Sequence, residues 1–179
     1  MQFKKIVIIG PESTGKSSLA AQLANHYKTQ WVPEYAREYL LKYGTDYTYE
    51  DLYTIAEGQI KGETDIINSL QPATRNPQLI FIDTDLQVIK VWSEFVFNKC
   101  DNRILTAIAN RQYDLYLLCN TDLPWVKDEL REYPDLESRE KLYHYYKETM
   151  INQSVPWEEI SGNHEERLQK AICAVNSLI

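Results

Sequence analysis

Five short apolar segments punctuate the chain, and longer stretches of mixed apolar and polar residues separate them. Runs rich in Val, Ile, Leu and Phe that stop at glycine or aspartate are typical of strands buried on both faces of a sheet. We therefore predict strands at Phe3–Ile9, Gln30–Pro33, Gln78–Ile82, Leu115–Cys119 and Val155–Ile160.

The intervening stretches carry apolar residues at spacings of three and four, the period of a helix that buries one face. Leu19 and Leu23 show this spacing in the first stretch. Gly44 provides a stop for the second helix, and Thr48–Asp51 has the pattern of a capping box that starts the third. We predict helices at Lys16–Tyr27, Glu34–Tyr43, Thr48–Leu70, Leu86–Phe97, Asn102–Asn110, Ser138–Gln153 and Glu165–Leu178.

Strands that alternate with helices predict an α/β fold, here a parallel five-stranded sheet with helices on both faces. The chain shows no repeat and no linker, so we expect a single domain over residues 1–179. Pro72 and Pro77 bracket a predicted loop. The charged, proline-flanked segment Pro124–Asp135 is expected to be mobile and to belong to a lid at about residues 123–140.

The charge of the chain limits the classes of partner. Nineteen basic and 26 acidic residues give a net charge of −7, and no basic stripe is visible. Proteins that bind nucleic acid usually present such a stripe. We therefore expect a small-molecule substrate and no nucleic-acid partner.

Cysteine usage and hydropathy bear on the compartment. Cys100, Cys119 and Cys173 are odd in number and form no C-x-x-C pair, which predicts free thiols in or near the core in a reducing cytosol. The first apolar run reads as a strand rather than a signal sequence, and no run approaches the roughly 18 apolar residues of a membrane span. We expect a cytoplasmic protein with no membrane partner; the sequence does not indicate its oligomeric state.

The strongest motif is G-x-x-x-x-G-K-[ST], which lies between the first strand and the first helix. Glycines let successive N–H groups turn inward toward phosphate oxygens, and the helix N-terminus adds partial positive charge. Lys16 is expected to reach the β- and γ-phosphates of ATP, and the Ser17 hydroxyl to bind Mg²⁺. The predicted phosphate-binding residues are Gly10, Glu12, Ser13, Thr14, Gly15, Lys16, Ser17 and Ser18.

A bound nucleotide needs a second hold on its metal ion. Asp83 follows an apolar strand, where a carboxylate can bind Mg²⁺ directly or through water. Strand ends gather at one edge of a parallel sheet, so Asp83 and the phosphate loop should meet there. Asp85 could face the same crevice, and either aspartate could instead cap the next helix.

Other candidates follow the second strand and flank the charged segment. Glu34 could accept a proton from an acceptor hydroxyl and Arg37 could hold phosphate, or the two could form only a salt bridge along the helix. Arg131 and Arg139 could be delivered by a closing lid to a transferring phosphoryl group, or could belong to a solvated face.

Two classes of P-loop protein lack support. A regulatory GTPase needs D-x-x-G after the third strand, where Leu86 occupies the glycine position. It also needs N-K-x-D after the fourth strand, where Leu123 replaces the aspartate that reads guanine. An AAA-type machine would need more chain for its helical lid domain. A small-molecule kinase fits the length and the acidic surface.

Several segments are shared with one known family. GPESTGKSSLA, WVPEYAREYL, IAEGQ, FIDTDL and PWVKDELR occur in order, within about Lys5 to Arg167. Together they resemble the ribosylnicotinamide kinase domain, which lies at the C-terminal end of bifunctional NAD-biosynthesis proteins behind an adenylyltransferase domain. The phosphate loop is common to all P-loop proteins, whereas the E-Y-x-R-E, F-I-D-T-D and W-V-x-D-x-L-R elements are specific as a set.

The resemblance implies a thymidylate-kinase-like fold with an arginine-bearing lid. It implies transfer of phosphate from ATP to the 5′-hydroxyl of nicotinamide riboside, giving nicotinamide mononucleotide. It also implies that Asp83, Arg37, Asp128, Arg131 and Arg139 surround the phosphates, with Glu34 near the acceptor. For the acceptor site we expect Glu34, Tyr35, Arg37, Asp85 and Asp128, and for catalysis Lys16, Asp83, Glu34, Arg131 and Arg139.

The chain departs from the bifunctional proteins because its phosphate loop begins at residue 10, so we expect neither NAD synthesis nor operator binding. Another nucleoside or nucleotide could be the acceptor. The alternative from a different class is an ATP-binding ATPase or regulatory module. ATP consumption that depends on an added nucleoside distinguishes the two. The catalytic base stays open among Glu34, Asp83 and Asp85.

Overall fold

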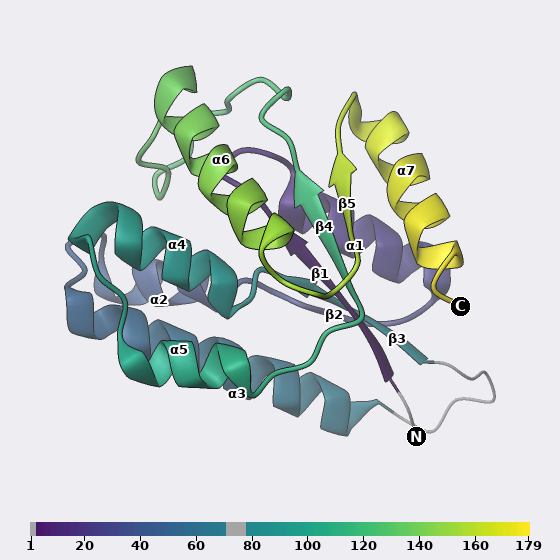
Figure 1. Cartoon of the computed structure of the whole chain (residues 1–179), viewed down its shortest axis with the longest axis horizontal. Coiled ribbons are helices and arrows are strands. Elements are labelled where there is room, and N and C mark those ends of the chain that lie inside the picture. Colours follow the sequence, from purple (N-terminus) through teal and green to yellow (C-terminus); the bar gives the residue numbers. More distant parts are fainter. Residues whose placement is uncertain (1–2, 71–77) are drawn as a thin grey trace.

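The computed structural model describes residues 3–70 and 78–179. Within them, five parallel strands form one sheet in the order β2-β3-β1-β4-β5 (Figure 1). The strands are β1 (Phe3–Ile9), β2 (Trp31–Val32), β3 (Gln78–Asp83), β4 (Leu115–Cys119) and β5 (Trp157–Ile160). The predicted five-stranded parallel sheet is therefore confirmed.

Helices follow the strands as the apolar spacing predicts. They are α1 (Lys16–Tyr27), α2 (Tyr35–Tyr43), α3 (Tyr49–Ser69), α4 (Leu86–Phe97), α5 (Asn102–Ala109), α6 (Leu136–Ile151) and α7 (His164–Asn176). The start of α6 differs from the predicted Ser138, because the Asp135 side chain accepts a hydrogen bond from the Ser138 N–H and caps the helix two residues earlier. Pro72 and Pro77 lie outside the described residues.

Alternate residues of the central strand bury against opposite helical layers. Ile6 and Ile8 pack in a cluster with α1 and α7, whereas Val7 and Ile9 pack in a second cluster with residues of α4 and α6. Figure 1 shows α1 and α7 on one side of the sheet and α3, α4 and α6 on the other. The continuous apolar character of β1 thus follows from burial on both faces.

A third apolar cluster lies among α2, α3, α4 and α5, where Leu52 and Ile55 meet Leu86, Ile89 and Ile104. It fixes these helices against one another beyond the edge of the sheet. Consequently the start of α2 and the body of α4 have defined positions beside the carboxyl ends of the strands.

The register of the sheet places three candidate segments at one edge. Ile8 of β1 lies opposite Asp83 of β3, and Val32 of β2 lies opposite Ile82. The chain after β1, the start of α2 and the end of β3 therefore leave the sheet together. In open α/β sheets this edge is where ligands bind.

Two expectations about environment can be compared with the structure. All three cysteines are free, but only Cys119 is buried and Cys173 is exposed, so the prediction of a core position was wrong for Cys173. Among residues 3–70 and 78–179, no helix combines the length and apolar character that crossing a membrane requires.

Candidate active site

The phosphate-loop motif forms a tight turn between β1 and α1. Gly10 has φ 137°, and a Cβ there would lie 2.6 Å from the Cys119 carbonyl oxygen, so no larger residue fits. Gly15 has φ 80° and precedes the first turn of α1. The Thr14 hydroxyl donates to the Pro11 carbonyl at 2.7 Å and closes the turn. The motif therefore has the strand–loop–helix context that phosphate binding requires.

Arg167 of α7 supports this turn from outside. It is buried and donates to the Thr14 carbonyl at 3.0 Å and to the Asn120 carbonyl at 2.9 Å, and it pairs with Asp122. A guanidinium that donates to several carbonyls fixes their relative positions. Arg167 thus joins the phosphate loop to the end of β4, a role that the sequence pattern did not indicate.

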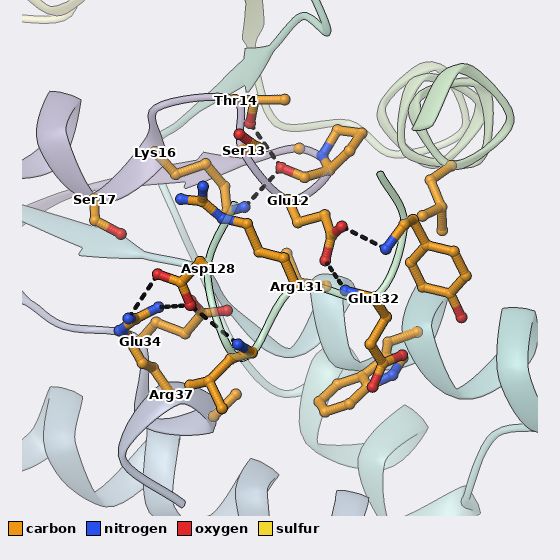
Figure 2. Close-up of a pocket in the computed structure, with 18 of the residues that line it drawn as sticks. Glu12, Ser13, Thr14, Lys16, Ser17, Glu34, Arg37, Asp128, Arg131 and Glu132 are labelled. Atoms are coloured by element: carbon orange, nitrogen blue, oxygen red, sulfur yellow. Dashed lines mark hydrogen bonds and ion pairs between the residues drawn. The ribbon is translucent and has the colours of Figure 1, made fainter. Parts of the chain in front are cut away.

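A cavity of about 390 Å³ opens over the phosphate loop (Figure 2). Its size is in the range of small-ligand sites. Residues of the loop form one wall, and α2, α4, α6 and the Pro124–Asp135 segment form the others. Of the predicted site residues, those lining it are Gly10, Glu12, Ser13, Thr14, Gly15, Lys16, Ser17, Ser18, Glu34, Arg37, Asp128 and Arg131.

Asp83 lies beneath this cavity and is buried, with an exposed fraction of 1%. Within the described part of the chain, neither carboxylate oxygen has a hydrogen-bond partner of standard geometry, although Ser17 lies beside Asp83. Burial, and next the charge of Glu34, raise the pKa of Asp83, while Lys16 and the Ser17 hydroxyl lower it. Two unpartnered buried oxygens next to a serine hydroxyl have the chemistry that a bound Mg²⁺ requires, so these residues fit the ion.

Lys16 and Glu34 line the cavity from two different elements, the start of α1 and the start of α2. The Lys16 ammonium donates to the Pro11 carbonyl at 2.9 Å, so it is held at the rim of the loop. Glu34 occupies the N-cap position of α2, but its side chain makes no capping hydrogen bond. The Glu34 carboxylate therefore lines the cavity without being committed to its own helix.

Arg37 pairs across the cavity rather than along α2. Its guanidinium makes two hydrogen bonds to Asp128, at 3.2 and 2.9 Å (Figure 2). The alternative of a Glu34–Arg37 salt bridge is not seen among the described residues. The pair lowers the pKa of Asp128 through the Arg37 hydrogen bond, and it ties the Pro124–Asp135 segment to α2.

The Pro124–Asp135 segment has no regular secondary structure in its middle, yet it is held at several points. Glu132 accepts a hydrogen bond from the Tyr47 hydroxyl at 3.1 Å, and the Tyr47 oxygen accepts one from the Trp92 indole at 2.8 Å. Figure 2 shows the Arg131 side chain pointing toward the phosphate loop. The segment therefore brings a cation and a carboxylate to the same cavity.

Besides Asp83, three further predicted site residues do not line the cavity. Arg139 of α6 is buried and donates to the Thr121 and Leu123 carbonyls at 3.4 and 3.3 Å. The Tyr35 ring packs on Gly58 of α3. Neither side chain lines the cavity.

Asp85 is the third, and its geometry favours the helix-capping alternative. Its carboxylate accepts from the Gln87 N–H at 3.0 Å, as the N-cap of α4, and from the Tyr116 hydroxyl at 2.7 Å. Burial raises its pKa to about 6. It lines a separate cavity of about 190 Å³ with Arg111 and Tyr113, away from the phosphate loop.

The helical walls of the cavity contain residues that the sequence analysis did not assign to the site. Val88, Trp92 and Phe95 line it from one face of α4, at spacings of four and three that the sequence displays. Leu142 and Tyr146 of α6 are likewise four apart. Glu132 and Tyr133 complete the wall, and their only signal was their place directly after Arg131.

The fold and the site together define a P-loop α/β protein of the nucleotide-binding type. A family described as "AAA domain" matches residues 5–167, and the chain belongs to this family. The AAA-type machines, which the sequence analysis excluded because the chain is too short for their helical lid domain, have the same name. The match to the family, however, covers the P-loop domain of this chain.

The chain is also homologous to the trifunctional NAD biosynthesis/regulator protein NadR. It is 24% identical to that of Escherichia coli (strain K12) over 98% of this chain and 43% of the relative. It is 30% identical to that of Salmonella typhimurium (strain LT2) over 72% of this chain and 31% of the relative. The chain thus spans less than half the length of the curated relatives it matches. The predicted resemblance to the bifunctional NAD-biosynthesis proteins is confirmed.

Solved structures agree on the fold. A crystal structure of NadR protein in complex with NR matches with a TM-score of 0.81 and 24% identity, over 98% of this chain and 49% of that one. Another, with NAD and AMP-PNP, matches with a TM-score of 0.72 and 22% identity over the same shares. Thymidylate kinase from Ehrlichia chaffeensis matches with a TM-score of 0.65 and 11% identity over all of both chains. The expected thymidylate-kinase-like fold is confirmed.

Proposed function

We propose that the chain phosphorylates the 5′-hydroxyl of nicotinamide riboside with ATP, giving nicotinamide mononucleotide. The observation that carries this proposal is the composition of the cavity above the phosphate loop. It combines the phosphate-binding turn with aromatic rings and carboxylates on its opposite wall. The homology to NadR and the binding of NR, an abbreviation of nicotinamide riboside, by a NadR protein support the choice of acceptor.

The acceptor wall suits a flat cation. Nicotinamide riboside carries a fixed positive charge on its pyridinium ring, and a cation over an aromatic face gains roughly 0.5–2 kcal/mol. Trp92, Phe95 and Tyr133 supply aromatic faces, and Glu132 supplies a carboxylate among them. The Trp92–Tyr47–Glu132 hydrogen bonds keep the ring and the carboxylate together. A neutral base would gain less from this charge.

The phosphate side holds the nucleotide. Backbone N–H groups of the loop and the Lys16 ammonium bind the β- and γ-phosphates of ATP. Ser17 and Asp83 would hold Mg²⁺, which when bound offsets phosphate charge and orients the γ-phosphoryl group. Arg131, on the segment that covers the loop, meets the charge that spreads over the transferring oxygens.

Glu34 is the base of the proposed reaction, because it lines the cavity while Asp83 lies beneath it. As the 5′-oxygen of the acceptor forms a bond to the γ-phosphorus, its proton passes to the Glu34 carboxylate. The bond from the γ-phosphorus to the β,γ-bridging oxygen breaks, and the electron pair leaves on ADP.

The test measures ADP release from ATP and Mg²⁺ with nicotinamide riboside, uridine, cytidine, thymidine or adenosine, with mass spectrometry of the products. We expect nicotinamide riboside to give the highest kcat/KM. Lys16→Ala should abolish turnover, whereas Lys61→Ala, which removes an exposed lysine of α3, should not. A neutral nucleoside with the highest kcat/KM would contradict the acceptor. Slow hydrolysis that no nucleoside stimulates would favour an ATPase module.

A further inference from the structure

Glu12 stands in the phosphate loop with a charge of the same sign as the phosphates that the loop is built to bind. A carboxylate near a polyphosphate repels it, so its presence needs another reason. Its side chain lies among the residues that line the cavity, but its hydrogen bonds go to the Pro124–Asp135 segment. The phosphate loop thus carries a carboxylate that binds the Pro124–Asp135 segment rather than the loop itself.

Three donors of that segment converge on the Glu12 carboxylate. The Glu132 N–H donates to Oε2 at 2.9 Å and the Tyr133 N–H to Oε1 at 2.6 Å (Figure 2). The Trp125 indole donates to Oε1 at a longer 3.5 Å. Hydrogen bonds from neutral donors to an ionised carboxylate are stronger than those between neutral groups.

The next loop residue binds the other end of the same segment. Ser13, with φ 57°, accepts a hydrogen bond from the Val126 N–H at 2.9 Å. Arg131 Nη1 donates to the Val126 carbonyl and so joins the two ends of the segment to each other. Two consecutive residues of the phosphate loop therefore hold both ends of the segment, at 125–126 and at 132–133.

The residues held in this way are the ones that the proposed reaction uses. Arg131 directly precedes the two backbone groups that Glu12 binds, and Glu132 and Tyr133 carry those groups. This stretch has no helix or strand of its own, so its position depends on such contacts. A displacement of about 1 Å at a reacting group can cost about 10²-fold in rate.

We propose that Glu12 is a positioning residue whose carboxylate holds the Pro124–Asp135 segment over the phosphate loop, and thereby places Arg131 against the γ-phosphoryl group and Glu132 and Tyr133 in the acceptor wall. The proposal rests on the proposed kinase function for its catalytic consequence. The holding contact itself does not, because it exists between residues of this chain without substrate.

The first measurement is limited proteolysis with trypsin in the absence of substrate, with mass spectrometry of the cleavage sites. Lys127 lies exposed within the held segment. Glu12→Ala should accelerate cleavage after Lys127 by about tenfold or more, since local opening exposes the site. Glu129→Gln, which removes the same charge from an exposed position of the same segment, should cleave at the wild-type rate. Unchanged cleavage in Glu12→Ala would overturn the proposal.

The second measurement uses steady-state kinetics and a double-mutant cycle. Glu12→Ala should lower kcat by about 10²-fold and change the Kd of ATP little. Its effect should be much smaller in an Arg131→Ala background, because Glu12 acts in part through Arg131. Additive effects together with a weakened Kd for ATP would show direct nucleotide binding and overturn the proposal.

Glu12→Gln is a second, more conservative variant, for the case in which Glu12→Ala does not fold correctly. It keeps one acceptor oxygen and turns an NH₂ group toward a backbone donor, so cleavage and kcat should both lie between wild type and Glu12→Ala. Thermal unfolding confirms that each variant is folded. If wild type phosphorylates no nucleoside, the proposed function fails, and the proteolysis comparison still decides the role of Glu12.

Discussion

Two arginines, Arg131 within the Pro124–Asp135 segment and Arg139 after it, have different surroundings. Arg131 lines the cavity, and its side chain points toward the phosphate loop (Figure 2). Arg139 has an exposed fraction of 3%, and burial lowers its pKa. Because Arg139 donates to the carbonyls of Thr121 and Leu123, it holds the stretch of chain that directly precedes the segment.

Alanine at these positions should therefore give different defects. Arg131→Ala should reduce kcat by about 10³-fold with a small change in the KM for ATP, since its interaction strengthens in the transition state. Arg139→Ala leaves buried carbonyls without donors and should lower the free energy of unfolding by about 2 kcal/mol. Steady-state kinetics and urea unfolding of both variants provide the measurement. A purely kinetic defect in folded, fully stable Arg139→Ala would contradict the assignment.

The sequence predicted residue types at the site better than side-chain directions. The phosphate loop, Glu34 and Arg37 line the cavity because motif spacing and strand ends determine backbone position. Asp85 and Tyr35 follow the same strand ends but turn away, Asp85 to cap α4 and Tyr35 to pack on Gly58. Such choices depend on tertiary neighbours, which a pattern in one stretch of sequence does not contain.

At the scale of elements, α3 fixes the distance between two strand ends. Gln59 is buried, and its Oε1 accepts from the Tyr35 N–H at 2.8 Å while its Nε2 donates to the Thr84 carbonyl at 3.0 Å. The start of α2, with Glu34, is thereby tied to the end of β3, with Asp83. One amide thus links the chain next to Glu34 with the chain next to Asp83.

Gln59→Leu should remove this tie. It leaves the partly buried Tyr35 N–H and the buried Thr84 carbonyl unpaired, so the free energy of unfolding should fall by about 2–3 kcal/mol. We also expect kcat to fall, because the start of α2 is released from the end of β3. Gln22→Leu, on the exposed face of α1, should change the free energy of unfolding by less than about 0.5 kcal/mol. Equal stability of the two variants in urea would contradict the role of Gln59.

Most element boundaries could be predicted because local signals mark them. Gly44 ends α2 with φ 93°, and the Asp51 carboxylate accepts from the Thr48 N–H and hydroxyl in the predicted capping box. The two-residue β2 is shorter than Gln30–Pro33, since its pairing to β3 involves only Trp31 and Val32. Strand length here depends on a neighbouring strand that lies far away in sequence.

At the scale of the whole molecule, the strand order shows what the apolar pattern leaves out. The pattern predicted five parallel strands, but it does not state that β3 lies between β1 and β2 or that β4 and β5 extend the other side. That order puts the loop after β1 at the centre of the sheet edge, with β3 and β4 on either side. The loop therefore shares a cavity with α2 and α4, and it rests on Cys119 and Arg167.

Besides its backbone pairing with β4, the outer strand β5 is joined by one carboxylate to α6 and to the end of β4. Glu159 accepts from the Asn120 amide at 2.8 Å and from the Lys147 ammonium at 2.9 Å. The Tyr143 hydroxyl lies beside Glu159 and is the largest cause of its low pKa, although the contact does not meet strict hydrogen-bond geometry. Among the groups that lower this pKa, Lys147 and Asn120 come next. Together they hold the pKa of Glu159 at about 2, below its usual value of about 4.3.

A depressed carboxylate pKa stabilises the folded state above the unfolded pKa and loses that effect as pH falls toward the folded pKa. Wild type should therefore exceed Glu159→Gln in free energy of unfolding by about 1 kcal/mol at pH 7, a value reduced because the side chain is one-third exposed. The difference in free energy of unfolding should shrink as the pH falls from about 4.5 to about 2, because Glu159 becomes protonated and is then neutral like the glutamine that replaces it. Urea unfolding across this range measures it, with the neighbouring exposed Glu158→Gln as control. A difference that persists at pH 2, or that Glu158→Gln reproduces, would show that the ionised Glu159 does not join β5 to α6 and the end of β4.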